Sequence, residues 1–147
     1  MKVALKLGAW IVGVSLCCAV AKVPPKVLKV KIEGTELDRA MLLQKLIRNG
    51  KDPDVVRHRM KFELVDADYD YRIVFATSQS TTQFTIWGSG GSMNSSNASA
   101  DVFDSKGTEL FRFERNQRGT DEGATNDVAY EIIKRILKLD KLNSRHD

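Results

Sequence analysis

The chain has 147 residues, a formal net charge of +4 and two cysteines, Cys17 and Cys18. This length allows one domain with a substantial hydrophobic core, and the small net charge excludes the strongly basic composition of most nucleic-acid-binding domains. Because both cysteines lie close to the N-terminus, the rest of the chain cannot form a disulfide, a cysteine metal site or a thiolate nucleophile.

The first 21 residues have the three parts of a cleavable secretory signal. Lys2 and Lys6 form a basic start, an uncharged run extends from Leu7 to Ala21, and the small residues Ala19 and Ala21 precede the expected cleavage site. The apolar run is shorter than the ~20 residues that a spanning helix needs. We therefore expect an exported protein, periplasmic, extracellular or envelope-associated, with no transmembrane span after signal cleavage.

Cleavage after Ala21 would remove two of the 23 basic residues and leave 126 residues with a formal charge of +2. Cys17 and Cys18 raise the alternative of a lipoprotein. Lipid attachment requires a small residue before the cysteine, whereas Leu16 precedes Cys17. The pattern favours cysteines that simply belong to the apolar run, and lipid attachment at either one stays an alternative.

The first part of the mature chain predicts a strand and then a helix. After an extended lead-in over residues 22–26, residues 27–32 alternate apolar and charged side chains, as a half-buried strand does. Thr35 predicts the N-terminal cap of a helix over residues 36–48, and Asn49-Gly50 predicts a left-handed C-terminal cap. The predicted apolar face of this helix comprises Leu37, Ala40, Met41, Leu43 and Ile47.

The middle of the chain predicts short strands followed by a flexible loop. Residues 61–65 and 71–77 alternate in hydrophobicity, and residues 82–87 predict a further short strand. The segment Gly88–Asn97 consists mostly of serine and glycine, which predicts a flexible loop.

The last third predicts a hairpin and a second helix. Strands at residues 98–103 and 108–115 flank Asp104–Gly107, whose glycine suits a tight turn. Asn126 predicts the N-terminal cap of the helix, and residues 141–147 predict a flexible tail. The predicted apolar face of the helix comprises Val128, Ala129, Ile132, Ile133, Ile136, Leu137 and Leu139.

The order of these elements is β-α-β-β-(β)-β-β-α. Each helix has one apolar face and the strands alternate, which predicts a single α+β domain over residues 27–140. We expect a two-layer sandwich in which both helices cover one face of a mostly antiparallel sheet. The first β-α-β step should form a parallel pair.

Three stretches together resemble a known group of proteins: Phe62–Tyr69, the hairpin Val102–Phe111 and the closing helix from Asn126. Their order is similar to that of small exported α+β domains of bacterial envelope proteins. These include the N-terminal domain of the Tol-system translocation protein and the periplasmic part of curli-secretion-type lipoproteins. The resemblance implies a non-enzymatic scaffold or interaction domain of the cell envelope.

The predicted loop at residues 88–97 has apolar residues around it, which suggests a contact surface for another envelope protein. Trp87 and Met93 bracket its glycine-rich part, and Phe84 lies just before it. The alternative is that Trp87 folds back to cover a sheet edge. The same loop contains formal N-glycosylation sequons at Asn94 and Asn97, which matter only in a eukaryotic secretory pathway.

Asp66, Asp68 and Asp70 alternate as the first ligands of a calcium loop do. Such a loop also needs a glycine at its sixth position and a glutamate at its twelfth, where this chain has Tyr71 and Thr77. A polar turn in solvent is therefore favoured, and no metal or other cofactor is predicted.

No nucleophile-base pair or phosphate-binding loop is evident, so an enzyme would have to be a small hydrolase using carboxylates such as Asp66, Asp68 and Asp70. A carrier or sensor of a small ligand seated between sheet and helices is the other alternative.

Arg112, Arg115 and Arg118 lie close to phenylalanines in the sequence, but acidic neighbours dilute their charge. We therefore expect a solvated strand face and no nucleic-acid partner. The oligomeric state is left open.

Overall fold

The computed structural model describes residues 24–143, without the side chains of residues 141–143. The predicted signal, the first residues of the lead-in and residues 144–147 of the predicted tail lie outside the described residues. The last helix passes residue 140, where the domain was expected to end. In chain order the elements are β1 (Lys26–Glu33), α1 (Glu36–Asn49), β2 (Met60–Leu64), β3 (Tyr71–Ile86), β4 (Ser89–Asp104), β5 (Glu109–Arg118) and α2 (Asp121–Asn143).

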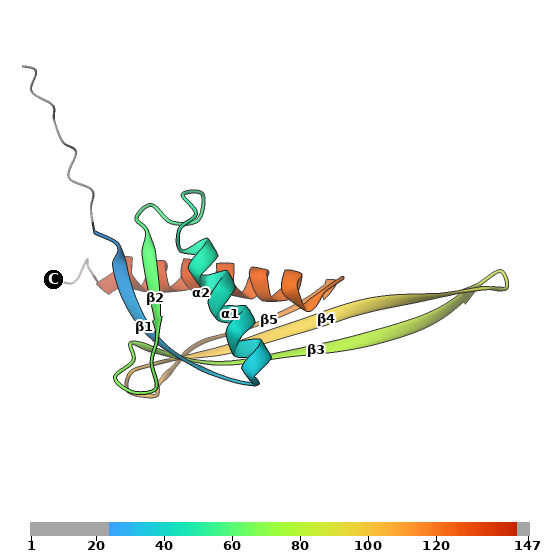
Figure 1. Ribbon diagram of the computed structural model, residues 1–147, viewed down its shortest axis with the longest axis horizontal. Helices are drawn as coiled ribbons and strands as arrows, with labels where there is room; N and C mark the ends of the chain where they lie inside the picture. Colours follow the sequence, from blue (N-terminus) through green and yellow to red (C-terminus); the bar gives the residue numbers. More distant parts are fainter. Residues whose placement is uncertain (1–23, 144–147) are drawn as a thin grey trace, which may run out of the picture.

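The five strands form one mixed sheet in the order β2-β1-β3-β4-β5 (Figure 1). β1 pairs in parallel with both β2 and β3, whereas β3, β4 and β5 pair antiparallel. The α+β class and the parallel pair of the β-α-β step are confirmed. The sheet is mixed rather than purely antiparallel, because β1 lies between two strands that both run in its own direction, but the long β3–β4 and β4–β5 ladders make most of its residue pairs antiparallel.

The segment between β2 and β3 crosses β1 in only six residues. β2 pairs with β1 as far as Val30, and β3 pairs with β1 from Val30 onward, so the two strands occupy successive halves of β1. The N–H of Val65 donates to the carbonyl of Val30, and the N–H of Asp70 donates to the carbonyl of Lys29. These bonds hold the crossing segment against the middle of β1.

The buried side chains of the strands share one face of the sheet. Along β1, β3 and β4, buried residues alternate with exposed or half-exposed ones, as expected when only one face meets a core. Both helices contribute to the same core cluster and also pack against each other (Figure 1). The largest fully buried apolar side chains are Phe75, Leu42, Leu46, Ile73, Ile132, Ile133 and Ile136.

α1 begins where the sequence predicts, but it buries a different face. Thr35 Oγ1 accepts a hydrogen bond from the N–H of Asp38 at 3.2 Å, which confirms the cap. Leu42 and Leu46 are fully buried, whereas Leu37 of the predicted apolar face is 73% exposed. The helix contacts both the sheet and α2, so its buried side differs from the one that packing on the sheet alone would select.

Gly50 directly follows α1 with a φ of −68°, so the predicted left-handed cap is wrong. A Cβ atom at this position would lie 2.9 Å from the ring of Phe62 and 3.0 Å from the carbonyl oxygen of Met60. The Gly50 carbonyl accepts a hydrogen bond from the N–H of Met60 at 2.8 Å. Glycine is needed here because β2 approaches closely, not because the backbone is left-handed.

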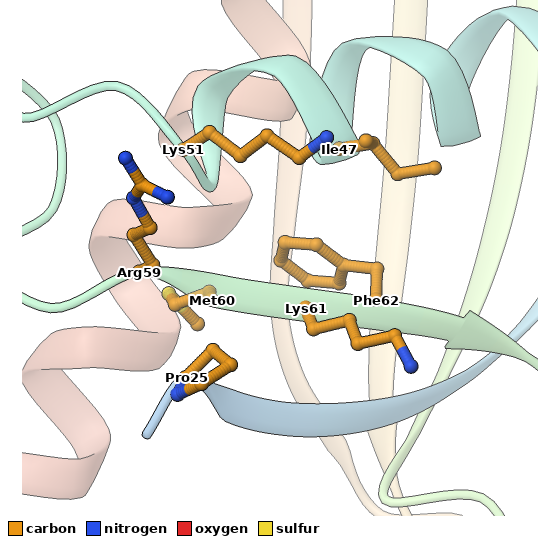
Figure 2. Close-up of a pocket in the computed structure, with 7 residues that line it drawn as sticks. All are labelled: Pro25, Ile47, Lys51, Arg59, Met60, Lys61 and Phe62. Atoms are coloured by element: carbon orange, nitrogen blue, oxygen red, sulfur yellow. The ribbon is translucent and has the colours of Figure 1, made fainter. Parts of the chain in front are cut away.

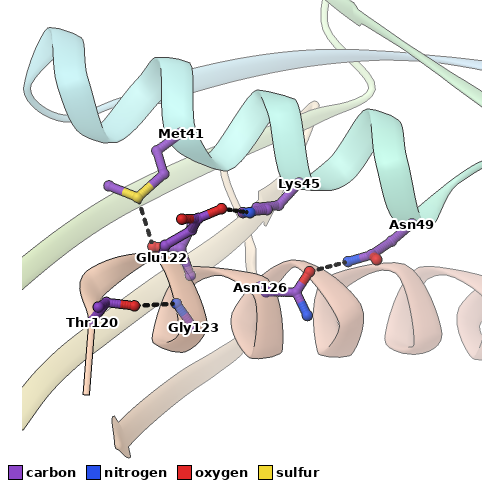
Figure 3. Close-up of polar contacts among 8 residues, drawn as sticks. Met41, Lys45, Asn49, Thr120, Glu122, Gly123 and Asn126 are labelled. Carbon is purple, nitrogen blue, oxygen red and sulfur yellow. Dashed lines mark hydrogen bonds and ion pairs between the residues drawn. The ribbon is translucent and has the colours of Figure 1, made fainter. Parts of the chain in front are cut away.

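α2 begins at Asp121, five residues before the predicted cap at Asn126. The hydroxyl of Thr120 accepts a hydrogen bond from the N–H of Gly123 at 3.4 Å and caps the helix (Figure 3). Asn126 lies inside the helix instead, and its side-chain oxygen accepts a hydrogen bond from Asn49 of α1 at 3.4 Å. The predicted apolar face is confirmed by the complete burial of five of its members, namely Val128, Ala129, Ile132, Ile133 and Ile136.

The predicted flexible loop at residues 88–97 is wrong, because Gly88 lies in a tight turn and residues 89–97 form the first part of β4. The predicted strands at residues 71–77 and 82–87 are one continuous strand, and β3 pairs with β4 in unbroken register from Tyr71 opposite Asp104 to Ile86 opposite Ser89. Serine and glycine favour flexible segments, but the hydrogen bonds of an antiparallel ladder use only the backbone. The resulting hairpin extends far beyond the helices (Figure 1).

Candidate partner-binding hairpin

The outer part of the β3–β4 hairpin has no core beneath it. We call residues 80–95 the distal hairpin; within it every residue from Ser80 to Gly90 is exposed. β1 ends opposite Val74 of β3, and β5 ends opposite Ser95 of β4. β5 therefore reaches only the base of the distal hairpin, where the N–H of Gly119 also donates to the carbonyl of Asn94 at 3.2 Å. Residues 80–93 therefore form a two-stranded ribbon held only by the β3–β4 ladder.

Polar contacts at the base connect the hairpin to the helical layer. Thr77 donates to Asp38 at 2.5 Å, and the side-chain amide of Gln79 donates to Asp121 at the start of α2 at 2.5 Å. The buried hydroxyl of Ser96 donates to the carbonyl of Gly119 at 3.2 Å. These bonds fix the direction in which the ribbon leaves the body of the protein.

The two faces of the distal hairpin differ in polarity. Side chains directly opposite each other in a ladder share a face, and the register pairs Thr82 with Met93 and Phe84 with Gly91. Phe84, Ile86 and Met93 therefore lie on one face, where they are 40%, 58% and 37% exposed. The opposite face is polar and comprises Thr81, Gln83, Thr85, Ser92 and Asn94.

Trp87 occupies the tip and is 99% exposed. Trp87 and Gly88 have φ values of 52° and 79°, as a type I′ turn requires at both central positions. Asparagine and glycine adopt this conformation readily, whereas a bulky residue with positive φ is strained. The predicted alternative, in which Trp87 folds back over a sheet edge, does not occur in this structure.

Phe84 is held over the backbone of Gly91. A Cβ atom on Gly91 would lie 2.6 Å from the ring of Phe84, so any other residue at this position would displace the ring from its place over Gly91. Together with Ile86, Trp87 and Met93, this ring forms what we call the apolar tip. Ile86 is the member that the sequence analysis did not single out, although it alternates with Phe84 along the strand.

No charged residue occurs between Arg72 and Asp101. The body of the sheet is different on the same face: Arg72 pairs with Glu33 at 3.1 Å, and Arg112 pairs with Asp101. One face of the sheet thus changes from charged over the body to apolar at the tip. This unbroken uncharged run was a signal in the sequence that the analysis of local periodicity missed.

The aspartates considered as a weak calcium candidate, Asp66, Asp68 and Asp70, lie in the segment that connects β2 to β3. Asp70 accepts a hydrogen bond from the N–H of Lys29 at 2.8 Å, and Asp68 has a positive φ of 54° in the segment that crosses β1. Among residues 24–143, no group of three acidic, histidine or cysteine side chains could hold a metal ion. Asp66, Asp68 and Asp70 belong to a structural crossing segment.

Two of the three arginines considered as a nucleic-acid surface, Arg112 and Arg115, form ion pairs. Arg112 Nη2 lies 3.0 Å from Asp101 Oδ2, and this hydrogen-bonded pair raises the pKa of Arg112. Arg115 pairs with Asp127 of α2 at 3.3 Å. Phe111 and Phe113 are partly buried against the core on the other face of β5, as the alternation predicts.

A cavity of about 350 Å³ lies at the opposite end of the fold, between the end of α1 and the edge strand β2 (Figure 2). Phe62, Met60, Ile47 and Pro25 form its apolar surface. The cavity is also lined by three basic residues, Lys51, Arg59 and Lys61. Within the described part of the chain, Lys61 pairs with Glu63, whereas Lys51 and Arg59 form no ion pair. The cavity thus combines apolar walls with two uncompensated cations.

No helix within residues 24–143 is both long and apolar enough to cross a membrane. The sequon residues also have polar partners: Asn94 accepts a hydrogen bond from Thr81 at 3.0 Å, and Asn97 donates one to Glu114 at 2.8 Å.

No family model and no curated protein matches this chain. Among solved structures, it is similar to a minor lipoprotein of Acinetobacter baumannii, with 12% identity, a TM-score of 0.46, and coverage of 74% of this chain and 91% of that one. It is also similar to PelC from Paraburkholderia phytofirmans, solved as a dodecamer in two crystal forms. These show 16% and 12% identity, TM-scores of 0.39 and 0.38, coverage of 76% of this chain in both cases, and coverage of 82% and 84% of PelC. None of the three is described as a Tol or a curli protein, and similarity at this level does not extend to function.

Proposed function

We propose that this protein is an exported, non-enzymatic interaction protein of the cell envelope that uses the apolar tip of its β3–β4 hairpin to contact its partner. The proposed export rests on the signal-like first 21 residues. The main observation in favour of the proposed contact is that Trp87 is almost completely exposed, at the end of a ribbon that has no hydrophobic core beneath it.

The strain at Trp87 supports a role in contact rather than in folding. Trp87 is 99% exposed, so packing within the chain does not compensate for its positive φ of 52°. Strained residues that the fold does not require tend to mark functional sites. Exposed tryptophans are also the side chains that most often dominate binding energy in interfaces.

The test is co-sedimentation of the mature chain with isolated bacterial envelopes. Trp87→Asn removes the aromatic side chain but creates the Asn-Gly turn that hairpins prefer, so the ribbon should be retained. We expect this variant to bind at least about tenfold more weakly than the wild type, since loss of a central tryptophan typically costs more than the 1.4 kcal/mol that a factor of ten represents.

Thr85→Ser, on the polar face next to the tip, is the matched control and should sediment like the wild type. Hydrogen exchange of the β3–β4 ladder should be no faster in Trp87→Asn than in the wild type. Equal sedimentation of Trp87→Asn and wild type would contradict the proposed contact.

A second candidate function, binding of a small ligand, is favoured by the cavity at β2. Its volume of about 350 Å³ is at the small end of ligand pockets, which span roughly 300–1,000 Å³. Apolar walls with Lys51 and Arg59 at the margin suit an amphipathic anion. Dodecanoate should therefore raise the Tm of the wild type and raise it less in Lys51→Gln/Arg59→Gln, with Lys106→Gln as control. An unchanged Tm in the wild type would remove this candidate.

A further inference from the structure

We infer that the partner of the apolar tip is a lipid surface, into whose headgroup region Trp87 and the adjacent apolar side chains insert. This inference rests on the proposed function and specifies its partner. It concerns residues 80–95 alone and leaves the body of the protein in water.

The first argument is the absence of charge. Charged side chains are costly to move toward the hydrocarbon of a bilayer, and no charged residue lies between Arg72 and Asp101. The distal hairpin can therefore approach a bilayer without desolvating an ion. The charged side chains on the same sheet face, such as Arg112 and Asp101, lie over the body and not at the tip.

The second argument is the position of the apolar residues. The hairpin forms one end of the long axis of the molecule, and β1 begins at the other end (Figure 1). A flat surface can thus reach Trp87, Ile86 and Phe84 without touching the helices. Tryptophan is enriched at membrane interfaces, where its ring lies among the headgroups.

The third argument is the size of the contact. A stable protein interface of standard size buries about 800 Å² and 20–30 residues on each partner, whereas the apolar tip comprises four side chains, Phe84, Ile86, Trp87 and Met93. A lipid surface needs no matching partner residues, so a contact of this size can suffice.

The free edges of the ribbon limit how deep it can insert. Beyond Val74 on β3, and beyond Asn94 on β4, whose carbonyl accepts a hydrogen bond from the N–H of Gly119, neither strand of the hairpin has a second neighbour. The outward-facing N–H and C=O groups there need water or headgroups as partners. Open sheet edges are not tolerated within hydrocarbon. We therefore expect a shallow, interfacial position. The same free edges make a second copy of the chain the main competing occupant.

Trp87 is a direct fluorescence probe, because the other tryptophan of the sequence, Trp10, lies in the predicted signal and is absent from the predicted mature chain. Trp87 fluorescence is titrated with vesicles of phosphatidylcholine alone and of phosphatidylcholine with phosphatidylglycerol. We expect the emission to shift to the blue with both types of vesicle. Because the hairpin is uncharged, the chain should partition equally into both types, and added salt should not weaken the partitioning. Lipids brominated near the headgroup should quench the emission more than lipids brominated deep in the chains.

Ile86→Ser and Met93→Ser keep the probe and remove apolar surface. The double variant should partition roughly tenfold more weakly, as expected for the loss of two apolar contacts. Thr85→Ser is the matched control on the polar face and should partition like the wild type. Far-UV circular dichroism and Tm confirm that each variant is folded.

Three outcomes would overturn the inference. The first is the absence of a blue shift with either type of vesicle, and the second is a shift that occurs only with anionic vesicles and is abolished by salt. The third is a blue shift that needs no lipid, grows with protein concentration and coincides with oligomers in sedimentation. The last would assign the tip to a second copy. If intact envelopes bind the wild type but not Trp87→Asn, while protein-free vesicles bind neither, the lipid inference fails and the proposed function stands. If intact envelopes bind both chains equally, both fail.

Discussion

At the scale of single residues, close backbone approaches decide which side chain is possible. Gly34, between β1 and α1, has a φ of +152°, and a Cβ atom there would lie 2.4 Å from the carbonyl oxygen of Phe75. A Cβ atom on Gly90, in the distal hairpin, would have no neighbouring atom within 4 Å. One glycine is thus required by packing and the other is not.

We therefore expect Gly34→Ala to lower the free energy of unfolding by roughly 3 kcal/mol, because strain and a backbone clash act together. Gly90→Ala should change it by less than about 0.5 kcal/mol. Urea denaturation of both variants measures the difference. A fully stable Gly34→Ala would show that the β1–α1 connection can move away from β3.

At the scale of elements, the contact between α1 and α2 depends on a polar seam as well as on apolar packing (Figure 3). Lys45 of α1 is buried and pairs with Glu122 in the first turn of α2. The hydrogen bond from Lys45 holds the pKa of Glu122 below its usual value of 4.5. Thr125 of α2 also contacts the sulfur of Met41, with Oγ1 and Sδ 3.5 Å apart.

Glu122→Gln should lower the Tm, because it leaves the buried amine of Lys45 without its counter-charge. A carboxylate whose pKa is lowered by folding adds stability above the unfolded-state pKa and loses it as the pH falls through the folded-state pKa. The Tm difference from wild type should therefore be full at neutral pH and shrink below about pH 4.5.

Lys45→Met, which fills the same space with an apolar side chain, should cost less than Glu122→Gln or even stabilise the protein. Thermal unfolding of the three chains between pH 3 and pH 7 tests both statements. A pH-independent difference for Glu122→Gln would mean that the ion pair does not contribute.

At the scale of the whole molecule, the core and the distal hairpin are separable. Every buried residue of β3 and β4 lies outside residues 80–95. Thr81 and Asn94 face each other in the ladder, and their side chains are hydrogen-bonded at 3.0 Å. A two-residue turn can therefore replace everything between them.

Replacing residues 82–93 by Asn-Gly should shift the Tm by less than about 5 °C, because no core residue is removed, while binding to envelopes is lost. Thermal unfolding and co-sedimentation on the same preparation measure both. A large drop in Tm would show that the distal hairpin stabilises the body, and retained binding would place the contact elsewhere.

Export can be tested on the whole chain by mass spectrometry of the mature protein. The predicted signal cleavage gives an N-terminus at Lys22. A chain that begins at a lipid-modified Cys17 or Cys18 would instead establish the lipoprotein alternative. An intact N-terminus in the cytosol would contradict both export and the proposed envelope contact.

The sequence by itself determined the elements whose signals are local: β1, the cap of α1 at Thr35, the turn at Asp104–Gly107 and the apolar face of α2. It also singled out Phe84, Trp87 and Met93 as candidate contact residues, because large apolar residues stand out in a serine- and glycine-rich stretch; the structure shows that all three are exposed. These predictions depend on neighbours in the chain, and alternation or capping residues report on those directly.

Only the tertiary structure decided the rest. The position of β1 between two parallel strands, the buried side of α1 and the reason for Gly50 depend on segments that are distant in sequence. Residues 89–97 form a strand because β3 provides a backbone ladder, which composition does not reveal. The apolar tip is exposed because β1 and β5 end before it, and strand ends are set by pairing across the sheet rather than by the residues of the tip.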